Sequence, residues 1–313
     1  MRKKIGILGS RGFVGSGVVL AIANSGAQAL DLPRLQIPDG VRATDDLATV
    51  VGEIADVVVD QNVELLSALS GVECVVNAAG LASPTEPDYE LLWQTNTLLP
   101  AVLDHLCAHA GVERVVHVSS AAVQSDMSPL TEKAEWRAHS PYAESKKLAE
   151  TYLLEQAQTP TVIYRATSVI GPNRAIVERL LRLYRGRIAP IFGDGLAPLP
   201  LSALPNTCAA LAALAQNDRV GIVLQPWEGV TQQALADSLA GDRTRLVRLP
   251  ITGLYSTVRK VTDRLPGPVV AQLRRVDLLV FGQAQEATAL VSDGYKPVVN
   301  TVDYLAELTR PAS

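Results

Sequence analysis

Cysteine is scarce in this 313-residue chain, which contains three cysteines among its 313 positions. Cys74, Cys107 and Cys208 are scattered through apolar segments and do not have the spacing of metal ligands. We therefore expect reduced thiols in the protein core, no bound metal, and a cytoplasmic protein.

Long apolar runs and an excess charge of one sign are also missing. No apolar run reaches the roughly 18 residues that a membrane-spanning helix requires. The basic start Arg2-Lys3-Lys4 resembles a secretion signal, but the apolar run after it soon breaks at glycine, so we expect no secretion. The net charge of −4 gives no reason to expect nucleic acid or a membrane surface as a partner.

What the chain does contain is a glycine-punctuated turn at its start. Residues 5–8 are predicted to form an apolar strand, and residues 16–25 are predicted to form a helix. Between them the glycines have the spacing Gly-x-x-Gly-x-x-Gly, which lets a backbone turn tightly and approach a pyrophosphate at a helix N-terminus. The predicted phosphate-binding residues are Gly9, Ser10, Arg11, Gly12, Phe13, Val14 and Gly15.

Apolar strands and helical patterns alternate after this turn, which is typical of a parallel sheet. The further strands that we predict are residues 27–32, 55–59, 73–77, 115–118, 161–164 and 220–225. The helices that we predict among them are residues 64–69, 91–110 and 140–156. Together they predict an α/β fold with a Rossmann-type, doubly wound parallel sheet, in which ligands bind beyond the carboxyl ends of the strands.

Tyr142 and Lys146 are four residues apart on the helix predicted at 140–156, so they share one face. A free tyrosine has a pKa of about 10, and a nearby ammonium lowers that pKa, so the pair can exchange a proton with a hydroxyl or a carbonyl. The same spacing also occurs by chance on ordinary amphipathic helices. Here it follows a strand that ends in Ser119-Ser120 and a glycine-rich entry loop, and this combination is specific.

At this point the chain resembles the extended short-chain dehydrogenase/reductases, NAD(P)-dependent enzymes of the nucleotide-sugar epimerase/dehydratase type. The resemblance covers nearly the whole chain, densely to residue 172 and thinly afterwards. It rests on Gly9-x-x-Gly12-x-x-Gly15, Asp60, Asn77-Ala78-Ala79-Gly80, Asn96, Ser119-Ser120-Ala121-Ala122-Val123, Tyr142-x-x-x-Lys146, Arg165 to Pro172 and the weaker Gly294-Tyr295-Lys296-Pro297.

The resemblance implies a catalytic set. Tyr142 would be the acid/base, Lys146 would bind the nicotinamide ribose and lower the tyrosine pKa, and Ser120 would bond the reacting oxygen. We interpret Ser119 as a strand-end serine bonded to the backbone.

The resemblance also implies a cofactor-binding set. Asp60 would meet the adenine amino group, with a helix N-cap as the rival interpretation, and Asn96 is expected to support architecture more than chemistry. Besides the glycine turn, the predicted cofactor-binding residues are Arg34, Asp60, Gln61, Ala78, Ala79, Gly80, Asn96, Tyr142, Lys146, Ala166 and Ser168.

The chain departs from the family pattern at positions that affect the substrate. Ala121 and Ala122 stand where the dehydratases carry an Asp-Glu pair, which argues against dehydration by that route, and Gln124 replaces the usual aromatic residue. No arginine follows the loop at residues 193–195, so binding of a substrate diphosphate requires another arginine, such as Arg185 or Arg187, which can equally be a solvated helix charge.

Two interleaved domains are expected. Residues 1–172 would form the NAD(P)-binding Rossmann domain, to which residues 206–225 return as an alanine-rich helix and a strand. Residues 173–313 would mainly form a smaller substrate-binding lobe, with a helix at 176–184 and loops with a short strand at 186–205. The lobe carries scattered basic residues, Arg243, Arg245, Arg248, Arg259, Lys260, Arg274 and Arg275.

The leading functional hypothesis is an NAD(P)-dependent enzyme that acts on a secondary alcohol or ketone, as a nucleotide-sugar 4-keto reductase or 4-epimerase. A reductase or dehydrogenase of a steroid-like or small carbonyl compound is the first alternative. A non-catalytic dinucleotide sensor is the second, although such sensors usually lose the tyrosine and lysine.

NADP is favoured over NAD as the cofactor. Arg11 lies within the glycine turn and Arg34 follows the second strand, where a guanidinium can reach a ribose 2′-phosphate. Asp31 would oppose this as a strand-end carboxylate, but it follows Gly26 so early that we predict a mid-strand position for it. The resemblance further implies a homodimer in which the helices at 91–110 and 140–156 form a four-helix bundle with their copies.

Overall fold

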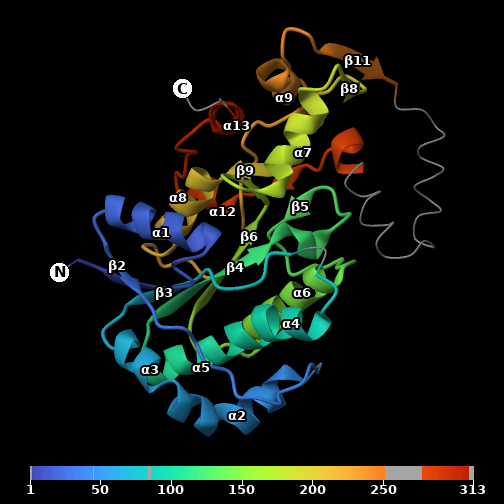
Figure 1. The fold of residues 1–313 in the computed structure, drawn as a ribbon. Helices are drawn as coiled ribbons and strands as arrows, with labels where there is room; N and C mark the ends of the chain where they lie inside the picture. Colours follow the sequence, from blue (N-terminus) through green and yellow to red (C-terminus); the bar gives the residue numbers. More distant parts are fainter. Residues whose placement is uncertain (1, 45, 84–85, 251–276, 310–313) are drawn as a thin grey trace. The chain divides into compact units, whose positions relative to one another are not determined.

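A computed structural model describes residues 2–44, 46–83, 86–250 and 277–309 of the chain (Figure 1). The chain divides into two compact units, each of which is discontinuous in sequence. Unit 1 comprises Met1–Ser125, Glu132–Ala166 and Thr207–Leu224. Unit 2 comprises Asp126–Thr131, Thr167–Asn206 and Gln225–Ser313.

A six-stranded parallel sheet forms the centre of unit 1. Its strands are β1 (Lys4–Leu8), β2 (Gln28–Asp31), β3 (Cys74–Asn77), β4 (Arg114–Ser120), β6 (Thr161–Ala166) and β10 (Gly221–Leu224). They lie in the order β10-β6-β4-β3-β1-β2. The chain leaves β1 for β2 on one side and returns to β3 on the other, so the strand order reverses at β1. This is the switch point of a doubly wound sheet, and it confirms the predicted fold class.

The register of the strands brings their carboxyl ends to one edge. Leu8 pairs with Asn77, and Ile7 pairs with Asp31, the last residue of β2. At the other half of the sheet, Ser120 pairs with Ala166. The residues that follow β1, β2, β3, β4 and β6 therefore meet at the same edge, where a parallel sheet places its ligands.

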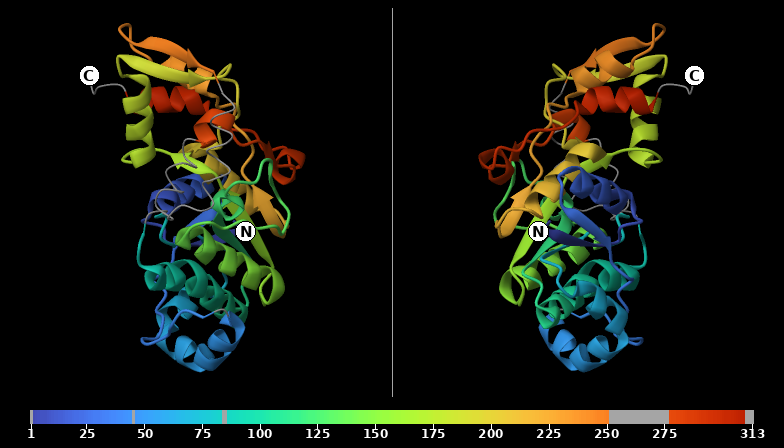
Figure 2. Two further views of the ribbon diagram at one scale, coloured as in Figure 1. Left: turned by 90° about the vertical axis from the view of Figure 1, so that its right-hand side faces the viewer. Right: turned by 90° about the vertical axis from the view of Figure 1, so that its left-hand side faces the viewer.

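Helices cover both faces of this sheet (Figures 1 and 2). The helices of unit 1 include α1 (Phe13–Asn24), α2 (Leu47–Gln61), α3 (Val63–Leu69), α5 (Leu99–Ala110), α6 (Pro141–Glu155) and most of α8 (Leu204–Leu214). α1 packs on β1 and β2, and α8 lies beside it, since the Cys208 thiol contacts the Val14 carbonyl oxygen. α3, α5 and α6 pack together on the opposite face, with α2 outermost against α5.

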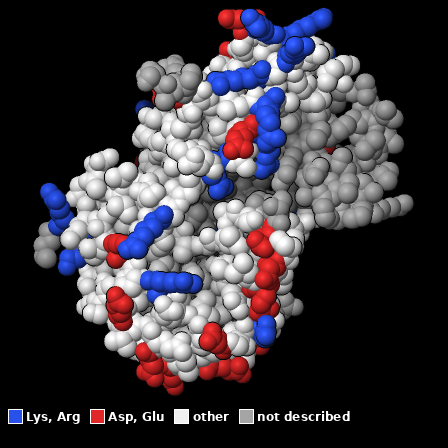
Figure 3. All heavy atoms as spheres, in the orientation of Figure 1, with Lys and Arg blue, Asp and Glu red and all other residues white. Residues whose placement is uncertain are grey.

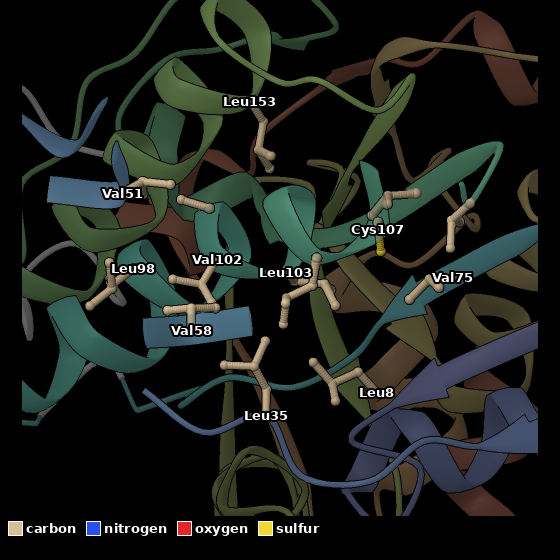
Figure 4. Close-up of a cluster of buried hydrophobic side chains, with 14 of the residues drawn as sticks. Leu8, Leu35, Val51, Val58, Val75, Leu98, Val102, Leu103, Cys107 and Leu153 are labelled. Carbon is tan, nitrogen blue, oxygen red and sulfur yellow. The ribbon is translucent and has the colours of Figure 1, made fainter. Parts of the chain in front are cut away.

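The largest hydrophobic cluster lies between the sheet and this second helix layer (Figure 4). Val51 and Val58 of α2 converge there with Val102 of α5 and with Val75 of β3. Each such buried side chain stabilises the fold by about 1.5–3 kcal/mol. Cys107 belongs to the same cluster, and burial raises the pKa of its thiol well above the usual value. All three cysteines are buried and unpaired, as the sequence predicts.

The strand predicted at residues 55–59 is wrong, because these residues belong to helix α2. Asp46 caps this helix, accepting a hydrogen bond of 3.1 Å from the Thr49 backbone N–H. Its apolar residues face the core at Val51 and Val58, seven positions apart, which is two helical turns. The acidic residues of α2 lie on its exposed side, and Figure 3 shows Asp and Glu side chains at the bottom of the view, where Figure 1 places α2.

The two long helices predicted beyond β3 are confirmed, with one addition. Residues 91–110 correspond to α4 (Tyr89–Trp93) and α5, joined without a break by a π-helical turn, Gln94–Leu98. α6 begins directly after its N-cap Ser140, whose hydroxyl accepts a hydrogen bond of 3.1 Å from the Ala143 N–H, and it ends before Gln156.

Among its described residues, unit 2 contains three small parallel strand pairs, four helices and a further helical segment at residues 277–281. The strands pair as β7 (Ser168–Ile170) with β9 (Leu201–Ala203), β8 (Ile188–Phe192) with β11 (Arg245–Leu249), and β5 (Leu130–Thr131) with β12 (Gln285–Glu286). The helices are α7 (Ala175–Tyr184), α9 (Gln232–Leu239), α12 (Ala289–Ser292) and α13 (Thr301–Leu308). Residues 186–205 thus contain two strands where one was predicted, and a separate core including Tyr184 and Leu235 packs beneath them.

The predicted basic residues Arg259, Lys260, Arg274 and Arg275 lie outside the described residues. Across the described part of the chain, no helix combines the length and the apolar character that crossing a membrane demands.

Candidate functional site

The glycine turn after β1 is tightly folded, as its spacing predicts. Gly9 has a φ of +82°, and a Cβ at this position would lie 2.7 Å from the Ala79 backbone nitrogen. A Cβ on Gly15 would lie 2.1 Å from the Gly9 carbonyl oxygen, so no side chain fits at either position. Gly12 is the N-cap residue of helix α1. As a glycine it has no side chain that could accept a hydrogen bond from the first N–H groups of the helix. The first N–H groups of α1 and the positive end of its dipole therefore face the turn, which suits a phosphate.

Asp31 ends strand β2 beside this turn, so its placement in mid-strand was wrong. Its carboxylate accepts a hydrogen bond from the Ser10 hydroxyl. The Arg11 guanidinium lies 3.6 Å from the same carboxylate, and both side chains are largely exposed. Arg34 lies in the exposed loop that follows. The end of the second strand is therefore occupied by the Asp31 carboxylate, with the Arg11 guanidinium beside it.

Ser120 is the last residue of β4 and the N-cap of a short 3₁₀ turn, Ala121–Gln124. Its hydroxyl oxygen accepts a hydrogen bond of 3.2 Å from the Ala122 N–H and stays partly exposed. Helix α6 packs against both β4 and this turn. The structure thus places the serine end of β4 against the helix that carries Tyr142 and Lys146.

Lys146 is the buried cation of this site, with 5% of its surface exposed. Its ammonium donates a hydrogen bond of 3.0 Å to the Val118 carbonyl oxygen, two residues before Ser120. Burial lowers the pKa of Lys146 to about 8, and the Glu150 carboxylate partly opposes this by favouring the charged form. Tyr142 lies one turn earlier, also buried, in the first turn of α6, where the helix dipole favours negative charge.

Gly80 brings the loop after β3 against the same lysine. It has a φ of +147°, and a Cβ on it would lie 3.3 Å from the Lys146 Nζ and 2.9 Å from the Asn96 Oδ1. Asn96, in the π-helical turn, holds this loop by accepting from the Leu81 N–H at 2.9 Å and donating to the Leu81 carbonyl at 3.1 Å. It also donates to the Ser145 hydroxyl of α6 at 3.2 Å. These contacts give Asn96 the architectural role that the sequence predicts.

A buried histidine supports the loop from inside the sheet. The His117 Nδ1 lies 3.2 Å from the Asn77 side-chain nitrogen, and the Asn77 Oδ1 accepts a hydrogen bond from the Ala79 N–H at 3.2 Å. Burial, together with the Lys146 charge, holds the pKa of His117 well below its usual range. His117 is therefore neutral at physiological pH and adds no charge beside Lys146.

The sequence reasoning missed a buried ion pair beneath this site. Arg165 on β6 and Glu150 on α6 are fully buried, and their Nη2 and Oε2 atoms lie 2.6 Å apart. The Ser119 hydroxyl donates to the Glu150 Oε1 at 2.6 Å, so the expected backbone bond of Ser119 is replaced by this contact. The position of Glu150, one turn after Lys146, was the available indication of its role.

Of the remaining predicted site residues, one lies at the sheet edge beside Ser120 and the others lie elsewhere in the fold. Asp60 and Gln61 are the last two residues of helix α2 and are exposed, so the strand end that suggested an adenine contact does not exist. Ala166 ends β6 in unit 1, next to Ser120 in the register. Ser168 begins β7 in unit 2.

Unit 2 provides a different arginine for the loop at residues 193–195. Arg248 of β11 donates to the Asp194 carbonyl oxygen at 2.8 Å and to the Gln233 side chain at 2.7 Å. Arg185 instead donates to the carbonyl and hydroxyl oxygens of Thr309, which joins the end of α7 to the end of α13. Arg187 is exposed. Of these arginines, Arg248 is the one that contacts the loop.

Together these residues form a suitable cradle for a dinucleotide. The glycine turn and the α1 N-terminus suit a pyrophosphate, Asp31 suits the hydroxyls of a ribose, and Lys146 beside Gly80 suits the hydroxyls of a second ribose. Ser120 and Tyr142 supply hydroxyl groups at the same sheet edge for proton exchange. The arrangement can therefore bind a nicotinamide dinucleotide and perform acid/base chemistry at an alcohol or a ketone.

Comparisons with known proteins agree with this geometry. Residues 5–223 match the sequence pattern of the NAD dependent epimerase/dehydratase family. The chain is 30% identical over 161 residues to a UDP-glucose 4-epimerase of Neisseria meningitidis serogroup C, covering 48% of this chain and 47% of that protein. It is 25% identical over 167 residues to the low-salt glycan biosynthesis protein Agl12 of Haloferax volcanii, covering 49% of this chain and 52% of that protein. The matched segments thus span about half the length of these curated relatives.

Solved structures share the fold over almost the whole chain. A Thermotoga maritima UDP-glucose 4-epimerase with UDP-glucose has a TM-score of 0.63 at 18% identity, with 97% of this chain and 98% of that chain covered. MoeE5 in complex with UDP-glucose and NAD has a TM-score of 0.62 at 21% identity, with 98% of each chain covered. The family match spans more than two thirds of the sequence, and from it we conclude that this chain belongs to the NAD dependent epimerase/dehydratase family.

Proposed function

We propose that this protein is an NAD-dependent oxidoreductase or epimerase that acts at a secondary alcohol or ketone of a nucleotide sugar, as a 4-epimerase or a 4-keto reductase. The observation that carries the proposal is the hydrogen bond of 3.0 Å from the buried Lys146 ammonium to β4, close to Ser120 and one helical turn from Tyr142. A non-catalytic dinucleotide sensor could use this lysine to hold its cofactor, but it would have no need of the hydroxyl groups of Ser120 and Tyr142 for proton exchange.

Tyr142 would be the acid/base in this reaction. Its oxygen would take a proton from the substrate hydroxyl during oxidation and return one to the carbonyl oxygen during reduction. Ser120 would hold the reacting oxygen by a hydrogen bond, and the Lys146 ammonium would favour the phenolate form of Tyr142. A bound nicotinamide ring would supply the hydride acceptor or donor.

The cofactor that we propose is NAD(H). The Asp31 carboxylate at the end of β2 is suited to accept hydrogen bonds from ribose hydroxyls, and it would repel a 2′-phosphate. MoeE5 and a Thermus thermophilus UDP-glucose 4-epimerase are both described with NAD. The preference for NADP that Arg11 and Arg34 suggest stays a prediction, and the contact between Arg11 and Asp31 weakens it.

The substrate class is supported by relatives and limited by the residues of this chain. UDP-glucose is bound in MoeE5 and in the Thermotoga maritima epimerase. Ala121 and Ala122 carry no ionisable groups, so we do not propose dehydration through these positions. Arg248, which contacts the loop at residues 193–195, is the candidate for a diphosphate contact that was missing from the sequence pattern. A reductase of another carbonyl compound is the alternative.

Incubation with UDP-glucose and NAD tests the proposal. Formation of UDP-galactose would support a 4-epimerase, and oxidation of NADH by a 4-keto nucleotide sugar would support a reductase. The Tyr142→Phe variant serves as the inactive control in both assays. Absence of both reactions in a protein that still binds NADH would refute a nucleotide-sugar substrate.

We also propose a homodimer through the exposed faces of α4 and α6, since α5, the remainder of the predicted helix pair, is already covered by α2. Leu91 of α4 is 41% exposed and Leu154 of α6 is 38% exposed, although both are large apolar residues. Pairing these helices with their copies would bury both side chains. A cytoplasmic location stays a prediction.

A further inference from the structure

Glu150 is a buried carboxylate that the proposed reaction does not use. It lies one turn after Lys146 on α6 and has no exposed surface. Its two oxygens accept hydrogen bonds from two strands and a loop: from Arg165 of β6 at 2.6 Å, from Ser119 of β4 at 2.6 Å, and from the indole N–H of Trp136, in the loop before α6, at 2.7 Å. This set of donors satisfies both oxygens of the buried carboxylate with hydrogen bonds.

The partners of Glu150 connect it directly to the proposed catalytic residues. Ser119 precedes Ser120, and Arg165 pairs with Ser119 in the register of β4 and β6. The same helix that carries Glu150 sends Lys146 to the Val118 carbonyl oxygen of β4. The carboxylate therefore joins α6, β4 and β6 at the level of the site.

We propose that Glu150 is a positioning residue for Lys146: anchored by Arg165, Ser119 and Trp136, its carboxylate keeps the buried Lys146 ammonium charged and in place beside the cofactor. The inference rests on the proposed function, because it assumes that Lys146 contacts a nicotinamide dinucleotide.

The charges around Lys146 support this assignment. Glu150 is the anion that favours the charged form of Lys146, whereas burial opposes that form and lowers the lysine pKa to about 8. His117, which faces Lys146 from β4, is held neutral by burial. Tyr142 lies one turn earlier on α6 itself, and Gly80 brings its backbone close to the Nζ. Without the Glu150 charge, Lys146 would lose its proton at a lower pH.

The test is the pH dependence of NADH binding, measured by the fluorescence of the bound cofactor between pH 6 and pH 10. In the wild type, affinity is expected to fall as pH rises through the Lys146 pKa, and the Lys146→Met variant is expected to lack this fall. Removing Glu150 alone would leave the buried Arg165 charge without its carboxylate, which destabilises the fold strongly. The variant that decides the question is therefore Glu150→Met combined with Arg165→Met, since an apolar replacement of a buried ion pair is commonly tolerated.

In this double variant the fall in NADH affinity should begin at a lower pH, because Glu150 favours the protonated form of Lys146, whereas Arg165 is not among the groups that shift its pKa. Trp136→Phe is the matched control: it removes one hydrogen bond from the same carboxylate and keeps the charge, so its pH dependence should follow the wild type. An unshifted double variant, or an equal shift in Trp136→Phe, would overturn the role of Glu150 and leave the proposed function intact. A wild type whose NADH affinity does not change with pH and is unaffected by Lys146→Met would overturn the cofactor role of Lys146, and both proposals with it.

Discussion

The Lys146 ammonium is hydrogen-bonded to the Val118 carbonyl oxygen at 3.0 Å, so the helix that carries the proposed acid/base is attached to the strand that ends in Ser120. This attachment needs a lysine long enough to cross from α6 to β4 and buried enough to exclude competing water. The attachment also places a charge in the protein interior, which affects the turnover, the pH dependence and the stability of the protein.

Replacement of Tyr142 by phenylalanine should lower turnover by about 10²–10⁴-fold, the range expected for the loss of a positioned acid/base. The affinity for NADH should stay nearly unchanged, because the lysine and the glycine turn remain. Steady-state kinetics and cofactor titration measure the two effects separately. Tyr152→Phe is the matched control, since Tyr152 is also buried on α6 but lies in the hydrophobic cluster; equal losses in both variants would contradict the assignment.

Turnover should decline as the pH rises above about 8. The pKa of Lys146 is lowered to about 8, so the fraction of charged lysine falls through this region, and with it the support for the Tyr142 phenolate. The pH profile of kcat/KM for the free enzyme tests this expectation. A profile that stays level to pH 10 would show that the charge of Lys146 is not required.

The Lys146→Met variant should be more stable than the wild type at pH 7, although inactive. A lysine pKa lowered from 10.5 to about 8 means that the folded state disfavours the charged form, by about 3 kcal/mol at 1.36 kcal/mol per unit. The lost hydrogen bond to Val118 and the lost attraction to the Glu150 charge offset part of this gain, so we expect the Tm to rise by about 2–4 °C.

The sign of this effect can be checked with pH. The unfolded chain keeps its lysine proton up to about pH 10.4, whereas the folded chain loses it near pH 8, so the wild type gains stability relative to the variant between these values. Thermal unfolding at pH 7 and at pH 10 should show the difference shrinking. A variant that is less stable at pH 7 would mean that the lysine contacts outweigh its burial.

Cofactor choice should depend on Asp31. The wild type should bind NADH more tightly than NADPH, and Asp31→Ala should reduce this preference by removing the charge that repels a 2′-phosphate. Arg11→Ala is the complementary variant and should weaken NADPH binding alone. Tighter binding of NADPH by the wild type would restore the preference that the sequence suggests.

A dimer should be found at micromolar concentration by light scattering. Leu91→Asp and Leu154→Asp place charges on the exposed apolar positions of α4 and α6 and should shift the protein to a monomer. Leu20→Asp, on α1, is the control for an exposed leucine outside this surface, at 66% exposed. A wild type that is monomeric throughout would refute the four-helix arrangement.

The parallel sheet could be predicted from sequence because most of its strands are short apolar runs bounded by glycine or small polar residues. The segment at residues 55–59 also looks like such a run, and there the prediction failed. The segment is helical because Val51 and Val58 pack in the hydrophobic cluster and because Asp46 caps the helix. A short apolar run alone does not distinguish a buried helix from a buried strand.

The site likewise contains residues that sequence spacing can place and residues that it cannot. Ser120, Tyr142 and Lys146 occupy fixed offsets from a strand end and along a helix, so their proximity follows from the sequence. The contact between Arg165 and Glu150 joins two elements, and the position of Asp31 depends on where β2 begins and ends. Neither can be obtained from spacing, because both are set by how separate segments pair.

The π-helical turn at Gln94–Leu98 restricts which mutations this chain can accept during evolution. A π turn holds one residue more than an α-helical turn, and it rotates everything that follows by about 100° relative to a regular helix. Deleting a single residue here would restore the regular helix, and it would swing Asn96 away from Leu81 or turn α5 out of the hydrophobic cluster. Single-residue deletions between Trp93 and Leu99 should therefore be lost by selection, even though substitutions at the half-exposed Thr95 are accepted.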